Sequence, residues 1–167
     1  TCLYQEVMEY TTDFTMDGKN EDLFFLSNGH ISPVFYSVLA HSGFFPVSEL
    51  ATFRLLNSRL QGHPTTHENL PGVRIASGSL GQGMSVGIGA AQTKKLNGDD
   101  KLVYTLHGDG ELQEGQNWEA IMYASAKKVD NIILDNFDHI SALITSIRKY
   151  RNEKGISYKE KLELFMV

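Results

Sequence analysis

The sequence has 167 residues, a length at which one folded domain can bury roughly two-thirds of the surface of the unfolded chain. Its hydrophobic fraction of 41% and charged fraction of 21% are typical of globular proteins, and they exclude a disordered, collagen-like or coiled-coil chain. The net charge is −5, from 15 Lys and Arg against 20 Asp and Glu, and no basic cluster is present, so no nucleic acid is expected as a partner.

The first ten residues bear on cellular location and on the first helix. Residues 1–6 lack the charge and the apolar core of a signal peptide, and no apolar run approaches the ~20 residues of a membrane span. The single cysteine, Cys2, cannot close an internal disulfide, which favours a reducing compartment. We therefore expect a cytoplasmic protein without a membrane partner. Apolar residues at helical spacing over residues 3–10 predict a short opening helix.

A strand and two helices are predicted before residue 60. The apolar run at residues 23–27 is too short for a helix and predicts a buried strand or extended segment, with His30 shortly after it. Residues 33–43 place their apolar side chains on one helical face, which predicts a core helix. A second helix is predicted to begin with Ser48 as its N-cap. Its inward-facing side chains would be Leu50, Phe53 and Leu56.

The segment from residue 62 to residue 89 is rich in glycine. Its glycines are Gly62, Gly72, Gly78, Gly81, Gly83, Gly87 and Gly89. Glycine inside a helix or strand costs up to ~1 kcal/mol relative to alanine, so this density indicates close backbone approach or left-handed backbone positions. Ligand binding is the simplest reason for it. A short β-like run at residues 73–75 precedes the turn at residues 78–83, and a helix-compatible stretch follows it.

A strand, turn, helix and second strand are predicted between residues 101 and 134. The two strands lie at residues 101–106 and 131–134, and the helix runs from about residue 114 to residue 126. The buried stripe of that helix would be Trp118, Ile121 and Met122. A right-handed crossover places the 107–114 loop at the carboxyl end of a parallel sheet, where ligands bind. The fold class is therefore α/β, a parallel sheet flanked by helices. A last helix is predicted from about residue 140 until Gly155.

The strongest local signal for chemistry is Gly108-Asp109-Gly110. A carboxylate on a glycine turn after a strand suits Mg²⁺, which prefers oxygen ligands and shares them with phosphate groups. The helix behind the turn offers free N–H groups to an anion. The alternative is a tight turn in which Asp109 bonds only its own backbone, and for an isolated motif of this kind that alternative is the commoner one.

The turn at residues 78–83 could cradle a phosphate. Its spacing is not G-x-G-x-x-G, however, and no acidic residue follows by about 20 positions at the end of a strand, so the indication of a nucleotide site is weak. A phosphate-loop NTPase is not supported, because the sequence lacks G-x-x-x-x-G-K-[ST].

The histidines fall into three groups. His63 and His67 resemble half a metal site, but a proline lies between them and no third ligand is evident, so zinc is not expected. His30 and His63 each follow a glycine, a loop setting that suits an exposed hydrogen-bonding imidazole better than a packed one. From the loop setting alone, a functional and a structural role are about equally expected for these two histidines. His41 and His139 are expected on helix surfaces or ends. No residue qualifies as the nucleophile of a hydrolase.

Four motifs in order over residues 27–120 resemble the transketolase family. They are Ser27-Asn28-Gly29-His30, Gly62-His63-Pro64, Pro71-Gly72-Val73 leading to Gly78–Gly83, and Gly108–Gly115 with Trp118-Glu119-Ala120. The resemblance implies a thiamine diphosphate-binding fold and covers the N-terminal, diphosphate-binding portion of such an enzyme. The Glu-Leu-Gln-Glu-Gly form of the last motif is similar to that of transketolases split into two chains.

The resemblance implies thiamine diphosphate and Mg²⁺ as cofactors. Asp109 would bind Mg²⁺, which bridges the diphosphate oxygens. Gly108 and Gly110 would let the backbone approach the diphosphate closely. Gly78 and Leu80 would line the pocket for the aminopyrimidine ring.

The resemblance also implies substrates and a partner. His30 and His63 would reach cofactor phosphate and sugar hydroxyls and assist proton transfer, as a two-carbon ketol unit moves from a ketose phosphate to an aldose phosphate. Glu114 would lie at the subunit contact that links two cofactor sites. The pyrimidine-binding domain would come from a C-terminal transketolase subunit, in a homodimer or heterotetramer.

The sequence departs from the family pattern near its C-terminus. The family has a second Mg²⁺ side-chain ligand, an Asn about 30 residues after the motif Asp, where this sequence has His139. A His-Pro-Gly-Gly segment and a further downstream histidine are also absent. We expect residues 1–167 to form a single diphosphate-binding domain, with segments missing before about residue 2 and after about residue 133. An intact mass near 18.7 kDa would contradict the missing segments.

Two other functions remain open from the sequence. A non-catalytic subunit could keep the fold but bind the diphosphate poorly for want of the Asn ligand. A nucleotide-binding module could use Gly78–Gly83 instead. Stabilisation of the folded chain by Mg²⁺ with thiamine diphosphate, as opposed to NAD or ATP, would separate these functions.

Overall fold

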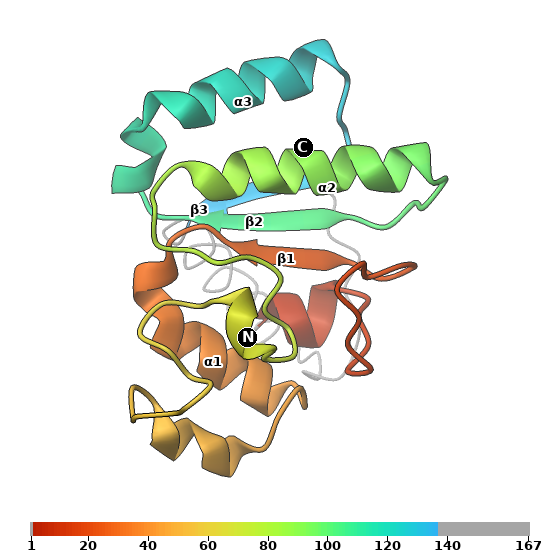
Figure 1. Cartoon of the computed structure of the whole chain (residues 1–167). Helices are drawn as coiled ribbons and strands as arrows, with labels where there is room; N and C mark the ends of the chain where they lie inside the picture. The colour runs from red at the N-terminus through yellow and green to blue at the C-terminus, as the bar shows by residue number, and fades with distance from the viewer. Residues whose placement is uncertain (1, 137–167) are drawn as a thin grey trace, which may run out of the picture.

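The computed structural model describes residues 2–136, and a parallel three-stranded sheet lies at its centre (Figure 1). The strands are β1 (Leu23–Leu26), β2 (Val103–His107) and β3 (Ile132–Asn136), in the order β1-β2-β3. Leu23 pairs with Val103, and Val103 pairs with Ile132. Because all three strands run the same way, their carboxyl ends meet at one edge. The predicted α/β class with a parallel sheet is confirmed.

Alternate residues of the strands serve two different hydrophobic cores. Phe24 and Leu26 of β1 pack with α1 (Ser32–His41) and with the π-helical turn η1 (Leu3–Val7) on one face. Their neighbours Leu23 and Phe25 pack on the other face, against α2 (Gln82–Leu96). This alternation follows from the two-residue repeat of a strand, and it sandwiches the sheet between α1 and α2 (Figure 1).

The third helix, α3 (Gly115–Ala126), lies on α2 on the side away from the sheet (Figure 1). Its predicted buried stripe is wrong in part: Trp118 is 57% exposed and Met122 is 65% exposed, whereas Ile121 is partly buried. The buried apolar residues are instead small ones, Ala120 and Ala124, which pack with Met84 and Ile88 of α2. The short alanine side chains let the two helices approach closely, so the larger apolar side chains of α3 point outward.

A close approach also explains one of the glycines of α2. A Cβ atom at Gly87 would collide with the side chain of Thr105 in the middle of β2. Glycine at this position therefore lets α2 lie directly on the sheet. At Gly87 the close backbone approach expected of the glycine-rich segment is therefore an approach of a helix to a strand and not to a ligand.

Several predicted elements differ in the structure. The opening helix is only the turn η1, and the helix expected from Ser48 is the 3₁₀ helix η3 (Val47–Thr52), with Pro46 at its N-cap. Leu50 and Phe53 pack on the core as predicted, but Leu56 is 92% exposed. The helix ends at Thr52, because Phe53 at its C-cap has a non-helical backbone (ψ 124°). Arg54 then adopts the left-handed conformation (φ 61°), so Leu56 lies beyond the helix.

Other predictions concern shorter or later segments. Residues 73–75 form no strand in the described part of the chain, which also contains the short 3₁₀ helices η2 (Gly29–Ile31), η4 (Thr66–Glu68) and η5 (Gly110–Gln113). The helix predicted after residue 140 and His139 lie outside the described residues. Among residues 2–136, no helix combines the length and apolar character that crossing a membrane would need.

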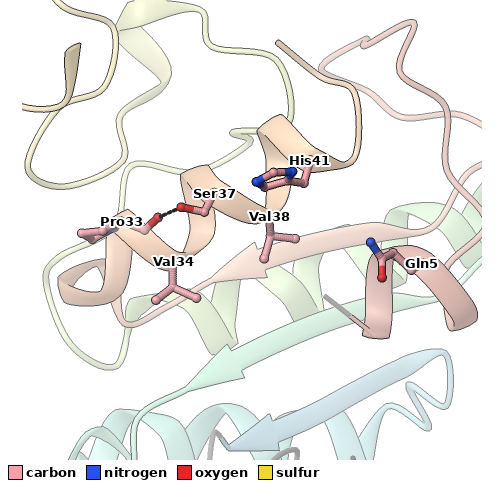
Figure 2. A pocket seen from close by; sticks show the side chains of 6 residues that line it. All are labelled: Gln5, Pro33, Val34, Ser37, Val38 and His41. Atoms are coloured by element: carbon pink, nitrogen blue, oxygen red, sulfur yellow. Dashed lines mark hydrogen bonds between the residues drawn. The ribbon is translucent and has the colours of Figure 1, made fainter. Parts of the chain in front are cut away.

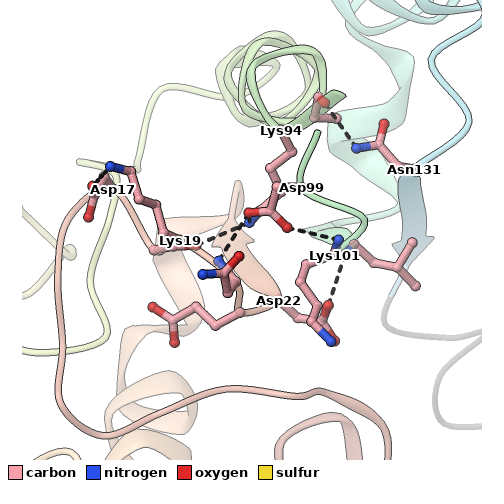
Figure 3. A network of polar contacts seen from close by, with 12 residues as sticks. Asp17, Lys19, Asp22, Lys94, Asp99, Lys101 and Asn131 are labelled. Carbon is pink, nitrogen blue, oxygen red and sulfur yellow. Dashed lines mark hydrogen bonds and ion pairs between the residues drawn. The ribbon is translucent and has the colours of Figure 1, made fainter. Parts of the chain in front are cut away.

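The amino ends of the strands are joined by a network of polar contacts (Figure 3). The buried Lys94 Nζ donates to Asp99 Oδ2 at 2.7 Å and to the carbonyl of Gly18 at 3.1 Å. Asp99 Oδ1 accepts from the N–H of Lys101, just before β2. Asn131, just before β3, donates to the carbonyl of Ala91 in α2 at 2.9 Å. These bonds fix how α2 lies across the sheet.

Candidate functional site

The residues predicted to carry chemistry gather at the carboxyl edge of the sheet. The loop after β1 carries His30, and the loop after β2 carries Asp109. The turn at residues 78–81 leads into α2 at the same edge, and His63 lies against that turn. Ligands of open parallel sheets bind at this edge, so the topology is consistent with the predicted position of the site.

His30 and His63, 33 positions apart in the sequence, lie side by side. Their ring centroids are 4.9 Å apart and the rings meet edge to face at 81°. Both side chains are exposed. The exposure expected of both imidazoles is therefore present, and their close approach to each other is a finding of the structure that the sequence did not predict.

Asn28 fixes the orientation of the His30 ring. Its Oδ1 accepts from the backbone N–H of His30 at 3.2 Å and lies 3.0 Å from Nδ1 of the ring. Because the backbone group is a donor, the Asn28 oxygen must face it, and Nδ1 must then carry a hydrogen. In the neutral ring, this assignment leaves Nε2 of His30 as a hydrogen-bond acceptor.

The turn at residues 78–81 runs directly along His63. A Cβ atom at Gly78 (φ +147°) would lie 3.0 Å from Cδ2 of His63, so a side chain there would push against the ring and would also strain the backbone. Leu80 is 39% exposed, so its side chain is available at the surface of the site. Gly81 adopts the left-handed conformation (φ 81°, ψ −4°) at the N-cap of α2. The predicted ligand-binding turn is thus formed by backbone positions that favour glycine.

Asp109 is exposed and lies two residues after the end of β2, at the N-cap of η5. Its carboxylate caps no backbone N–H and has no hydrogen-bond partner in the described part of the chain. The tight-turn alternative, in which Asp109 bonds its own backbone, is therefore not what the structure has. A Cβ atom at Gly110 would meet nothing within 4 Å, so the backbone beside Asp109 is open to a ligand.

These residues fit Mg²⁺ held together with a diphosphate better than a metal held by protein alone. No group of three His, Cys, Asp or Glu side chains within residues 2–136 is arranged to hold a metal ion. Asp109 offers one free carboxylate, and Mg²⁺ commonly takes one or two carboxylates plus phosphate oxygens and water.

Glu114 lies at the N-cap of α3, with its side chain exposed. A Cβ atom at Gly81 would lie 3.3 Å from the Cβ of Glu114, so Glu114 adjoins the turn before α2. Nearby, the exposed Trp118 donates from Nε1 to the carbonyl of Leu112 at 2.9 Å. The start of α3 is thus tied to the loop that follows β2.

Sequence reasoning missed the most connected side chain of the site, Glu111. It is 2% exposed, and Oε1 accepts from the hydroxyl of Ser27 and from the N–H of Gly81 at 2.8 Å. Oε2 accepts from the N–H of Gly108 at 3.2 Å. The sequence offers one signal for Glu111: it is a second acidic residue in the motif that contains Asp109.

His107 was predicted in the turn but is the last residue of β2 and 1% exposed. Its Nδ1 lies 3.5 Å from Oε2 of Glu111, and neither ring nitrogen has a hydrogen-bond partner among residues 2–136. Burial on its own would raise the pKa of Glu111. The neighbouring His107 ring and the hydrogen bonds from Ser27, Gly81 and Gly108 outweigh burial and lower that pKa to about 2.

The N-terminus of α2 is already bonded within the chain. The N–H of Gly81 donates to Glu111, and the N–H of Gly83 donates to Ser27 Oγ at 3.1 Å. Two donors that a phosphate would use in a nucleotide-binding turn are therefore taken by side chains.

A cavity of about 600 Å³ lies elsewhere, along the outer face of α1 (Figure 2). Its lining includes Val34, Val38 and Gln5, together with His41 at the exposed end of the helix, as predicted for that histidine. None of the predicted site residues lines it. The cavity is therefore separate from the carboxyl edge of the sheet.

Comparisons with known proteins agree on one family. Residues 1–146 match the family model described as transketolase, thiamine diphosphate binding domain. The chain is 42% identical over 115 residues to one subunit of the apulose-4-phosphate transketolase of Actinobacillus succinogenes, covering 69% of this chain and 41% of that protein. It is 40% identical over 140 residues to human transketolase, covering 79% of this chain and 22% of that protein.

A solved structure gives the same result for the fold. A transketolase from Pichia stipitis superposes with a TM-score of 0.71 at 31% identity, covering 77% of this chain and 20% of that chain. The predicted thiamine diphosphate-binding fold is confirmed. The chain spans less than half the length of these relatives.

Proposed function

Because the chain belongs to the transketolase family and matches its thiamine diphosphate-binding domain, we propose that it is the diphosphate-binding subunit of a split transketolase. The reaction would transfer a two-carbon ketol unit from a ketose phosphate to an aldose phosphate. The observation that carries the proposal is the meeting of the His30–His63 pair, the turn at residues 78–81 and Asp109 at one edge of the sheet.

Thiamine diphosphate, when bound, would supply the carbanion chemistry that ketol transfer needs. Asp109 would hold Mg²⁺, and the backbone at Gly108 and Gly110 would lie along the diphosphate. Gly78 and Leu80 would line the pocket of the aminopyrimidine ring. The free carboxylate of Asp109 and the open space beside Gly110 support these roles.

His30 and His63 would act on the sugar. Nδ1 of His30 carries a hydrogen that Asn28 holds, so Nε2 can accept a proton from a substrate hydroxyl and return it. His63, at edge-to-face distance, would bind a neighbouring hydroxyl or a phosphate oxygen. The exposure of both rings supports contact with a substrate that enters from solvent.

The proposed enzyme needs a second chain. The similar protein from Actinobacillus succinogenes is named as one subunit of its transketolase, and this chain matches only the diphosphate-binding part of human transketolase. We propose that a C-terminal subunit brings the pyrimidine-binding domain, in a homodimer or heterotetramer with Glu114 at the contact between cofactor sites. A cytoplasmic setting is part of the same proposal and follows from the single cysteine, Cys2.

Reconstitution tests the proposed function. Ketol transfer is expected only when the chain, its C-terminal partner, Mg²⁺ and thiamine diphosphate are mixed, and activity without the cofactor would contradict it. Asp109→Asn should abolish the transfer. The matched control is Asp100→Asn, an exposed aspartate before β2 at the other end of the sheet, which should leave the transfer unchanged.

The nucleotide-binding alternative is disfavoured by the bonds at the N-terminus of α2, because Glu111 and Ser27 already occupy the N–H groups of Gly81 and Gly83. Thermal unfolding separates the two functions. Mg²⁺ with thiamine diphosphate should raise the melting temperature of the assembled protein, and NAD or ATP should not.

A further inference from the structure

One buried carboxylate joins the three loops that carry the proposed site residues. Glu111 lies in η5, just behind Asp109, and its two oxygens accept from three different segments. The first segment is the end of β1, through Ser27. The second is the turn before α2, through Gly81, and the third is the end of β2, through Gly108.

Each residue that bonds to Glu111 lies close in the chain to a residue of the proposed site. Ser27 is three residues before His30, and its hydroxyl also accepts from Gly83 at 3.1 Å. Gly81 follows Leu80 directly in the chain. Gly108 precedes Asp109, and a Cβ atom at Gly108 would lie 2.8 Å from Nδ2 of Asn28, the residue that orients His30. A shift of Glu111 would therefore change the spacing between all three loops.

The chemistry of the contacts requires a carboxylate. The three groups that hydrogen-bond to the two oxygens are all donors: the Ser27 hydroxyl and the backbone N–H groups of Gly81 and Gly108. The Nδ1 atom of His107 also lies 3.5 Å from Oε2. A glutamine would turn a donating NH₂ group toward at least one of the three donors and leave that N–H or O–H unpaired in a buried place. The carbonyl of Glu111 is held as well, by Asn117 Nδ2 at 2.7 Å, so the backbone cannot move to compensate.

We propose that Glu111 is a positioning residue of the cofactor site, whose carboxylate holds the loops at residues 27–30, 78–83 and 108–110 at the spacing that thiamine diphosphate binding requires. This inference rests on the proposed function. It assigns no contact between Glu111 and cofactor or substrate: the residue acts through the glycine turns and through Ser27.

The test is the affinity of the assembled protein for thiamine diphosphate at saturating Mg²⁺, measured by isothermal titration calorimetry. Glu111→Gln should weaken binding about tenfold or more, the size expected when a hydrogen bond to a charged group is lost and its partner stays buried. Amide hydrogen exchange at Gly81, Gly83 and Gly108, without cofactor, should become faster in the same variant.

Two controls separate positioning from a general loss of stability. Leu39→Ala opens a cavity under α1, where Leu39 is fully buried, and should lower the melting temperature without changing the affinity for the cofactor. Glu9→Gln makes the same chemical change in a carboxylate that is 68% exposed at the amino edge and bonded to Lys101 Nζ. Loss of this surface ion pair should lower the melting temperature only slightly and leave the affinity for the cofactor unchanged. If Glu111→Gln does not fold, Ser27→Ala removes one donor of the cluster and should weaken binding by a smaller factor.

The outcomes separate this inference from the proposed function. If the unmodified protein does not bind thiamine diphosphate, the proposed function fails. If the unmodified protein binds and Glu111→Gln binds equally well, the positioning role is overturned while the proposed function stands. If Leu39→Ala loses affinity in proportion to its lost stability, as Glu111→Gln does, the role of Glu111 is merely structural and the inference is again overturned.

Discussion

The two ends of the sheet use charge in opposite ways. At the amino end, Lys94 is paired with Asp99, and the neighbouring Arg74 is paired with Glu21 through side chains that are each 6% exposed. At the carboxyl end, Glu111 is bonded mainly by backbone and hydroxyl donors, and the carboxylate of Asp109 is left without a partner among the described residues. Charges that are paired with each other stabilise the fold, whereas an unpaired carboxylate on a glycine loop is available to a ligand.

The largest effect is expected from a variant that disrupts the buried ion pair at the amino end of the sheet. Arg74→Met leaves Glu21 buried without its cation, which should lower the free energy of unfolding by ~3–5 kcal/mol, as denaturant titration can measure. Cofactor affinity, measured at a temperature where the variant is folded, should be unchanged. The double variant Arg74→Met/Glu21→Gln should recover part of the stability. If the single variant is as stable as the parent, the view that this end serves stability is wrong.

A pH titration addresses the carboxyl end. The folded pKa of Glu111, about 2, lies below its ordinary value of 4.5. Such a group contributes stability that is fully present above about pH 4.5 and is lost as the pH falls toward about 2. The shift corresponds to a contribution on the order of 3 kcal/mol. Glu111→Gln should therefore flatten the loss of stability in this window, and identical acid unfolding curves would contradict the ionised cluster.

Asp109→Asn tests the free charge. Binding of thiamine diphosphate in the presence of Mg²⁺ should weaken by ~100-fold. This is the upper end of the losses seen when residues that support metal ligands are mutated, and Asp109 is the proposed ligand itself. The melting temperature without cofactor should stay within about a degree, because the carboxylate has no partner to lose among the described residues. A large drop in stability with intact cofactor binding would reverse the contrast between the two ends.

Asn28→Ala gives the smallest effect. The ring of His30 loses the acceptor that holds Nδ1, so the turnover number should fall about tenfold, while the affinity for the cofactor stays the same. Steady-state kinetics of ketol transfer measure the first and calorimetry the second. Asn97→Ala, an exposed residue at the end of α2, is the matched control. Equal kinetics for both variants would show that His30 does not depend on Asn28.

The strands were predictable because short apolar runs bounded by glycine and charged residues are too short for a helix and are typical of buried strands. The right-handed strand–helix–strand unit then placed Asp109 at the carboxyl edge. The stripe of α3 was not predictable in the same way, because Trp118 and Met122 have the same spacing as a core stripe, and only contact with α2 shows that alanines form it. The spacing of apolar residues shows that a helix has an apolar face, but it does not show which face packs against a neighbouring element.

The role of Glu111 could not be read from the sequence for a related reason. Its burial depends on Ser27, 84 positions away, and on the turn at Gly81, 30 positions away. A carboxylate in a glycine-rich loop has the local pattern of an exposed residue. His30 and His63 were selected as separate loop histidines, and their pairing likewise depends on how the chain returns to the sheet edge.

The hydrogen bond from Trp118 to Leu112 has a practical consequence. The chain contains a single tryptophan, and its indole is exposed while held on the backbone of the loop between Asp109 and α3. The intrinsic fluorescence of the described chain therefore comes from a tryptophan that is bonded to the loop after Asp109. Changes in that loop can be followed optically, in real time, without labelling the protein.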